Sequence, residues 1–145
     1  MTERQREQVA PQPARVLIVD DHELTRAGLA AVLGREPAIE VIGEVGDGAA
    51  ALEFVSRYPV DLVLMDLQMP EMDGLEATRR LKALRPSISV IIITVQSRPE
   101  LLIEALQAGV AGYVLKDASR REILHAIRQV LSGEAFLNAD LVMQT

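Results

Sequence analysis

The chain has 145 residues, of which 49% are hydrophobic, 25% charged and 3% aromatic, the length and composition of one globular domain with its own core. A formal net charge of −6 argues against a nucleic-acid-binding surface as the main feature of this chain. No cysteine is present, which excludes disulfides and thiolate sites, and the scarcity of aromatic residues disfavours a carbohydrate or single-strand stacking platform.

The chain begins with a polar stretch, residues 1–14 (MTERQREQVAPQPA), that lacks the apolar core of a signal peptide. We expect these residues to form a disordered arm. No apolar run further along the chain approaches the roughly 20 residues that span a bilayer. These features predict a cytoplasmic domain with no membrane contact.

Five apolar runs of strand length follow, separated by stretches whose apolar residues recur at helical spacing. The runs are 16–19, 39–42, 62–65, 90–93 and 112–115. Most are apolar at every position, which is typical of strands buried on both faces of a parallel sheet. The second contains Glu40 and is expected to be more exposed.

Five helices are predicted between and after these strands. The first has apolar residues at helical spacing from Leu24 and stops at Gly34. The other four have start signals at Asp47 and Asp73 and at two capping boxes, Ser97 to Glu100 and Ser119 to Glu122. This alternation predicts an α/β fold of flavodoxin-like (βα)5 type, a five-stranded parallel sheet in the order 2-1-3-4-5 with helices on both faces.

Four of the predicted strands end at residues that carry polar chemistry. Asp20 and Asp21 follow the first strand, Asp66 the third, Thr94 the fourth and Lys116 the fifth. In an open parallel sheet, ligands bind beyond the carboxyl ends of the strands where the strand order reverses, here between strands one and three. The three aspartates are therefore expected to converge on one crevice.

Each aspartate taken alone is equally well explained as a loop or N-cap residue. Together they are costly, because two carboxylates about 4 Å apart repel by about 4 kcal/mol at an effective dielectric of 20. Three such pairs would approach the whole stability of a domain, about 5–15 kcal/mol. Lys116 supplies one compensating charge, and an all-oxygen ligand set without His or Cys favours Mg²⁺ as another.

The motifs resemble the receiver domain of bacterial two-component response regulators, over residues 15 to about 133. The resemblance rests on VLIVDDH (16–22), LMDLQMPEMDG (64–74), Thr94 and GYVLKD (112–117). The wording DDHELTRAGL (20–29) and YVLKDASRREIL (113–124) is similar to the NarL/FixJ-type branch, which usually carries a LuxR-type helix-turn-helix after the receiver.

The resemblance implies a role for each polar strand end. Asp66 would accept a phosphoryl group from the phosphohistidine of a sensor histidine kinase. Asp20 and Asp21, with Asp66 and the backbone carbonyl of Gln68, would bind Mg²⁺.

The remaining implied roles concern the phosphoryl group and its readout. Lys116 and Thr94 would contact phosphoryl oxygens, and Tyr113 would be the switch aromatic that turns inward when Thr94 moves. Thr94 as a plain β-branched strand end and Tyr113 as a packing residue are the structural alternatives. His22 is expected to face solvent, with its ring along the following helix, rather than to bind metal.

Two readings from other classes remain open. A Mg²⁺-dependent aspartyl-phosphate hydrolase would need a general acid two residues after its nucleophile, where this chain has Gln68. A flavodoxin-type nucleotide or flavin module would need a glycine-rich phosphate loop where this chain has DDHEL (20–24). The preferred interpretation is a phosphorylation-controlled switch that turns over no external substrate. Its only chemistry would be its own phosphorylation and slow dephosphorylation.

The resemblance also implies a domain organisation. Residues 15–133 are expected to form the receiver, and residues 134–145 to begin a linker towards a DNA-binding domain outside this chain. The expected partners are a sensor histidine kinase, a second copy of the chain after phosphorylation, and DNA only through that further domain, with transcription regulation as the output. A stand-alone receiver acting through protein contacts is the alternative.

Overall fold

Six parallel strands form one sheet in the order β2-β1-β3-β4-β5-β6 in the computed structural model, which describes residues 12–137. The strands are β1 (Ala14–Val19), β2 (Ile39–Val45), β3 (Leu62–Met65), β4 (Ser89–Thr94), β5 (Gly112–Leu115) and β6 (Phe136–Leu137). The predicted order of the first five is confirmed.

The sixth strand, β6, was not predicted from the sequence. It falls where a linker was expected and pairs in parallel with β5, Gly112 opposite Phe136 and Tyr113 opposite Leu137. The backbone N–H of Phe136 donates to the carbonyl oxygen of Ala111 at 3.0 Å. Two residues are too few to show a strand period, so only the neighbouring edge of β5 reveals them as a strand.

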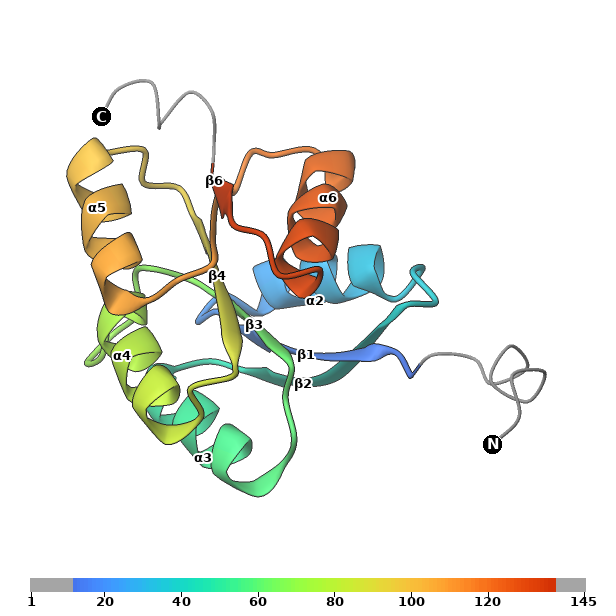
Figure 1. Ribbon diagram of the computed structural model, residues 1–145, viewed down its shortest axis with the longest axis horizontal. Helices are drawn as coiled ribbons and strands as arrows, with labels where there is room; N and C mark the ends of the chain where they lie inside the picture. Colours follow the sequence, from blue (N-terminus) through green and yellow to red (C-terminus); the bar gives the residue numbers. More distant parts are fainter. Residues whose placement is uncertain (1–11, 138–145) are drawn as a thin grey trace.

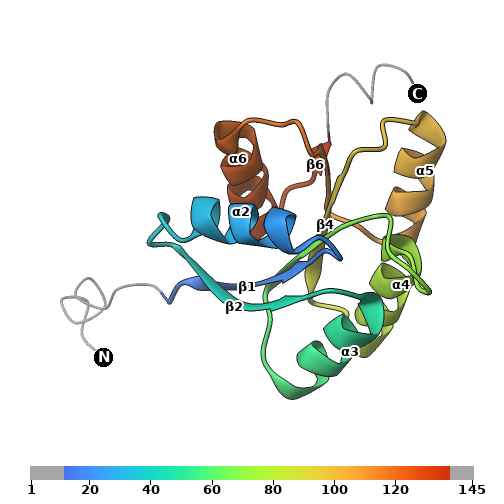
Figure 2. The same ribbon diagram turned by 180° about the vertical axis from the view of Figure 1, so that it is seen from behind.

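Helices cover both faces of the sheet (Figures 1 and 2). On one face lie α2 (Glu23–Leu33) and α6 (Arg120–Leu131); on the other lie α3 (Gly48–Arg57), α4 (Gly74–Leu84) and α5 (Pro99–Ala108). Alternate residues of β1 serve the two cores, because Val16 and Ile18 belong to the cluster under α2 and α6, whereas Leu17 and Val19 belong to the other.

Three of the predicted helix starts are capped as expected. The side chains of Asp47, Asp73 and Ser119 accept hydrogen bonds from backbone N–H groups of the first turns of α3, α4 and α6. The capping box at Ser97 is wrong. Pro99 occupies the first turn of α5, so the N-cap falls on Arg98, which makes no side-chain cap.

The carboxyl ends of β1, β3, β4 and β5 are bound to one another through the backbone. The N–H of Asp66 donates to the carbonyl oxygen of Val19 at 2.9 Å, and the N–H of Lys116 donates to that of Thr94 at 2.7 Å. The strands thereby hold their terminal polar residues in register at one edge of the sheet. Among residues 12–137, no helix combines the length and the apolar character needed to cross a membrane.

Candidate functional site

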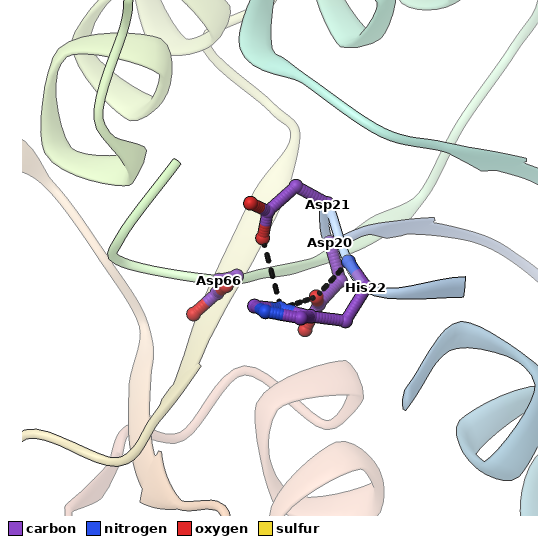
Figure 3. Close-up of side chains that lie close together, drawn as sticks. All are labelled: Asp20, Asp21, His22 and Asp66. Atoms are coloured by element: carbon purple, nitrogen blue, oxygen red, sulfur yellow. Dashed lines mark hydrogen bonds and ion pairs between the residues drawn. The ribbon is translucent and has the colours of Figure 1, made fainter. Parts of the chain in front are cut away.

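The loops after β1 and β3 bring three carboxylates and an imidazole together. One ligand atom from each of Asp20, Asp21, His22 and Asp66 lies within 4.8 Å of the others (Figure 3). Asp20 and Asp66 are buried, with 2% and 4% of their surface exposed, whereas Asp21 and His22 face solvent. The cluster therefore has a closed floor and an open mouth.

Lys116 compensates part of the buried negative charge. Its Nζ lies 2.9 Å from Asp20 Oδ2 and 3.4 Å from Asp66 Oδ2. Burial acts to lower the pKa of Lys116, but the hydrogen bond with Asp20 and the charges of Asp66 and Asp20 together raise it. The lysine therefore stays protonated at neutral pH and lies between the two buried carboxylates.

Asp66 remains incompletely satisfied despite this neighbour. Its Oδ2 is buried and has no hydrogen-bond partner, since Lys116 reaches it only as an ion pair. Burial and the nearby charge of Asp20 raise the pKa of Asp66, while Lys116 and the backbone N–H of Gln68 act to lower it. A buried acceptor without a partner is normally avoided, and a carboxyl with a perturbed pKa in such a place is a candidate for a functional site.

The donor set fits a hard divalent cation. Asp20, Asp21 and Asp66 offer carboxylate oxygens, the type of ligand that Mg²⁺ takes together with water. Gln68 lines a cleft of about 550 Å³ beside them, together with Asp21 and His22. Asp21 therefore belongs both to this cleft and to the carboxylate cluster that contains the buried Asp20 and Asp66.

Thr94 and Tyr113 are linked to each other through Gln96. The buried Thr94 hydroxyl accepts from the backbone N–H of Gln96 at 3.2 Å, and the Tyr113 hydroxyl donates to the carbonyl oxygen of the same residue at 3.0 Å. Burial raises the pKa of Tyr113 to about 12. Tyr113 is fully buried in the core and reaches the Gln96 backbone only through its hydroxyl.

His22 faces solvent as predicted, but its ring does not lie along the following helix. The side chain is 67% exposed, but Nδ1 lies 3.0 Å from Asp21 Oδ1 and 3.2 Å from Asp20 Oδ1. His22 is the N-cap of α2 and has extended backbone angles, so its side chain does not follow the helix. Its place directly after the acidic pair and before the helix was the signal for this orientation.

Arg26 contributes to the site and was not predicted from the sequence. Its guanidinium Nη1 donates to the backbone carbonyl oxygen of Asp20, and its own N–H donates to the carbonyl oxygen of His22 at 3.1 Å. One turn of α2 therefore holds the loop that carries Asp20 and Asp21. The guanidinium and the Asp20 carbonyl are six residues apart, so no helical spacing in the sequence indicates this contact.

Comparison with known proteins gives a consistent result. The sequence profile described as the response regulator receiver domain matches residues 16–128. The response regulator UvrY of Escherichia coli K12 is 41% identical over 129 residues, 89% of this chain and 59% of UvrY. The response regulator GacA of Pseudomonas aeruginosa is 38% identical over 130 residues, 90% of this chain and 61% of GacA.

Solved structures agree with the sequence relatives. The receiver domain of the putative response regulator NarL from Mycobacterium tuberculosis superposes with a TM-score of 0.81 at 36% identity, covering 86% of this chain and 100% of that one. A LuxR-family two-component response regulator from Aurantimonas gives a TM-score of 0.87 at 30% identity, covering 91% and 94%. The chain spans less than two thirds of the curated relatives UvrY and GacA.

Proposed function

The chain belongs to the response regulator receiver domain family, and from this premise we propose that Asp66 is its phosphoacceptor. The observation that carries the proposal is the buried Asp66 Oδ2, which has no hydrogen-bond partner and faces an ammonium group 3.4 Å away. An attacking oxygen needs a free lone pair and a nearby positive charge for the incoming phosphoryl group, and Asp66 has both.

In the proposed reaction, an Asp66 carboxylate oxygen attacks the phosphorus of a phosphohistidine on a sensor histidine kinase. A P–O bond forms to Asp66, the P–N bond breaks, and its electron pair returns to the kinase imidazole. The product is an acyl phosphate. Lys116 adds little covalent chemistry but holds a positive charge beside the oxygens of the transferred group, which is the main requirement of phosphoryl transfer.

The acidic residues prepare the site for a cation. Asp20, Asp21, Asp66 and the backbone carbonyl of Gln68 would hold Mg²⁺, which supplies charge neutralisation for the phosphoryl oxygens when it is bound. Arg26 holds the Asp20–Asp21 loop in place through the backbone of Asp20. A flavodoxin-type nucleotide site finds less support, because a carboxylate cluster repels phosphate unless a cation is present.

Thr94 and Tyr113 would convert phosphorylation into a change of packing. The Thr94 hydroxyl bonds the N–H of Gln96, whose carbonyl oxygen accepts from Tyr113. Movement of the Thr94 hydroxyl toward a phosphoryl oxygen would lengthen the first contact and thereby disturb the second. Phosphorylation would then bias two arrangements of the Gln96 loop and Tyr113, by as much as its interactions with the two differ.

We also propose how phosphorylation would be passed on, since the relatives UvrY and GacA are longer than this chain. We expect a cytoplasmic regulator of transcription in which DNA is contacted by a domain outside the chain. A solved complex of the response regulator RcsB with DNA, at 25% identity over the shared region, is in line with this expectation. A stand-alone receiver that acts through protein contacts is the second candidate.

The aspartyl-phosphate hydrolase reading has little support. The residue two positions after Asp66 is Gln68, an amide that cannot act as the required general acid. The chain would therefore turn over only its own phosphoryl group.

Mass spectrometry of the intact chain tests the proposal. Incubation with a small acyl-phosphate donor and Mg²⁺ should add one phosphoryl group to the parent chain and none to Asp66→Asn. The same mass gain in Asp66→Asn would show that Asp66 is not the acceptor. Asp73→Asn is a matched control because it also changes a carboxylate in the loop region after β3, and it should still gain the phosphoryl group.

A further inference from the structure

His22 lies against the acidic cluster in a way that its usual structural roles do not explain. It is the N-cap residue of α2, yet its side chain makes no capping hydrogen bond. Its ring instead lies between the carboxylates of Asp20 and Asp21, with the backbone N–H of His22 donating to Asp20 Oδ1 at 2.8 Å (Figure 3). Its ring therefore lies against the two carboxylates, although most of the side chain is exposed.

The Nδ1 atom of His22 and the two carboxylate oxygens beside it have one hydrogen at most between them. Nδ1 lies 3.0 Å and 3.2 Å from two carboxylate oxygens, and an imidazole nitrogen carries at most one hydrogen to share between them. A cation among the three atoms would satisfy all of them at once. Neighbouring ligands at metal–ligand distances of about 2.1 Å and right angles lie about 3.0 Å apart, close to the spacing seen here.

A separate observation also directs a ligand to this place. Asp66 belongs to the same cluster and follows a different strand, and its Oδ2, 3.4 Å from the Lys116 ammonium, is buried with no hydrogen-bond partner. The open mouth at Asp21 and His22 gives an ion access from solvent. The cluster therefore joins an unsatisfied buried oxygen to an accessible nitrogen.

We propose that His22 is a nitrogen ligand of the cation site and that it selects first-row transition ions over Mg²⁺. The inference rests on the proposed cation site and concerns which ions that site favours. Mg²⁺ takes oxygen ligands and gains little from imidazole, whereas the affinity of mixed nitrogen and oxygen sites rises from Mn²⁺ through Co²⁺ to Ni²⁺. The contribution of His22 should therefore grow along that series.

Calorimetric titration of the full chain, free of any histidine tag, with Mg²⁺, Mn²⁺, Co²⁺ and Ni²⁺ tests this. The measurement is made at about pH 8, because a histidine binds a metal ion through a deprotonated ring nitrogen. His22→Ala should leave the Kd for Mg²⁺ nearly unchanged and raise it progressively from Mn²⁺ to Ni²⁺. For Ni²⁺ we expect at least about a tenfold loss, the lower end of what supporting residues of metal sites contribute.

Three control variants separate the ligand role from other effects. His125→Ala removes the other histidine of the chain, which lies on α6 with its ring edge-on to Phe136 of β6. This variant should bind every ion as the parent chain does. His22→Asn keeps a polar residue at the helix start and should behave like His22→Ala. Asp21→Ala removes a proposed oxygen ligand and should weaken binding of all four ions.

The outcomes distinguish the inference from the proposed function. An equal effect of His22→Ala on all four ions, or tighter Mg²⁺ binding by that variant, would overturn the ligand role of His22. Retention of Ni²⁺ affinity by His22→Asn would overturn it as well. If Asp21→Ala binds every ion as the parent chain does, the cation site itself is wrong, whatever His22 does.

Discussion

The negative charge of Asp66 lowers the stability of the folded chain. Burial and Asp20 raise the pKa of Asp66, so the folded chain holds the proton of this carboxyl more tightly than the unfolded chain does. The ionised form therefore destabilises the fold above the folded pKa. The penalty is lost as the pH falls below the unfolded value of about 3.9.

The first prediction follows from this sign. Asp66→Asn should raise the free energy of unfolding at neutral pH by on the order of 1 kcal/mol, because it removes an unsatisfied buried charge. Thermal unfolding at several pH values should show the gain disappearing in acid. Glu104→Gln, an equal charge change at an exposed site, should stay within about 0.5 kcal/mol of the parent. A gain independent of pH would contradict the electrostatic cause.

Removing the charge of Lys116 should lower the free energy of unfolding, whereas removing that of Asp66 should raise it. Lys116→Met leaves Asp20 and Asp66 buried without their ammonium partner, and breaking a buried pair in this way costs about 3 kcal/mol. In the Asp66→Asn background the cost should be smaller, because one of the two stranded charges is gone. Denaturant unfolding of the four chains measures this coupling, and equal costs in both backgrounds would refute it.

At the scale of elements, the loop between β3 and α4 fixes where Asp66 lies. The N–H of Gly74 donates to the carbonyl oxygen of Leu67 at 2.8 Å, which closes the loop onto the strand end. A Cβ at Gly74 would overlap the backbone oxygen of Asp66 and approach Leu67 Cα to 3.0 Å. Because these obstacles are backbone atoms, they cannot move without moving Asp66.

Gly74→Ala should therefore destabilise the chain by about 3 kcal/mol or more and slow its phosphorylation. Gly28→Ala is the matched control, since nothing lies within 4 Å of a Cβ at that helical position. It should stabilise the chain by about 0.5–1 kcal/mol. Unfolding midpoints and phosphorylation rates of the two variants check this. A Gly74→Ala chain as stable and as reactive as the parent would contradict the role of the loop.

The sequence predicts elements well wherever a long apolar run or a capping side chain marks them. The five long strands follow from their apolar runs, and α6 starts at Ser119 as its motif predicts. Phe136 and Leu137 lack such a signal, because pairing with β5 alone makes them a strand. At the site, strand ends predict which residues meet, but the His22 ring direction depends on the backbone angles of one N-cap residue.

For the whole molecule, the proposed switch must act through a surface. α5 presents Ile103 and Leu106 with 48% and 44% of their surface exposed, close in sequence to the Gln96 loop. β6 covers the outer edge of β5 beside Tyr113, so this edge is less open than five strands would leave it. A second copy of the chain is the partner we expect this side to bind after phosphorylation.

Self-association should therefore increase with a phosphate-mimicking beryllium fluoride complex and Mg²⁺. Thr94→Ala should still accept the phosphoryl group on Asp66 but associate less, because it lacks the hydroxyl that links the site to Gln96 and Tyr113. Sedimentation of both chains with and without the mimic measures this. Equal association of the parent chain in both conditions would remove dimerisation as the output.

Chemical trapping tests directly, at the level of the residue, whether Asp66 forms an acyl phosphate. Borohydride reduces an acyl phosphate to an alcohol, so the phosphorylated chain should yield a peptide with homoserine in place of Asp66. Every other aspartate of the chain, including Asp20 and Asp21, should remain unchanged. Homoserine at any of those positions, or none at residue 66 in a chain that has gained a phosphoryl group, would contradict the account.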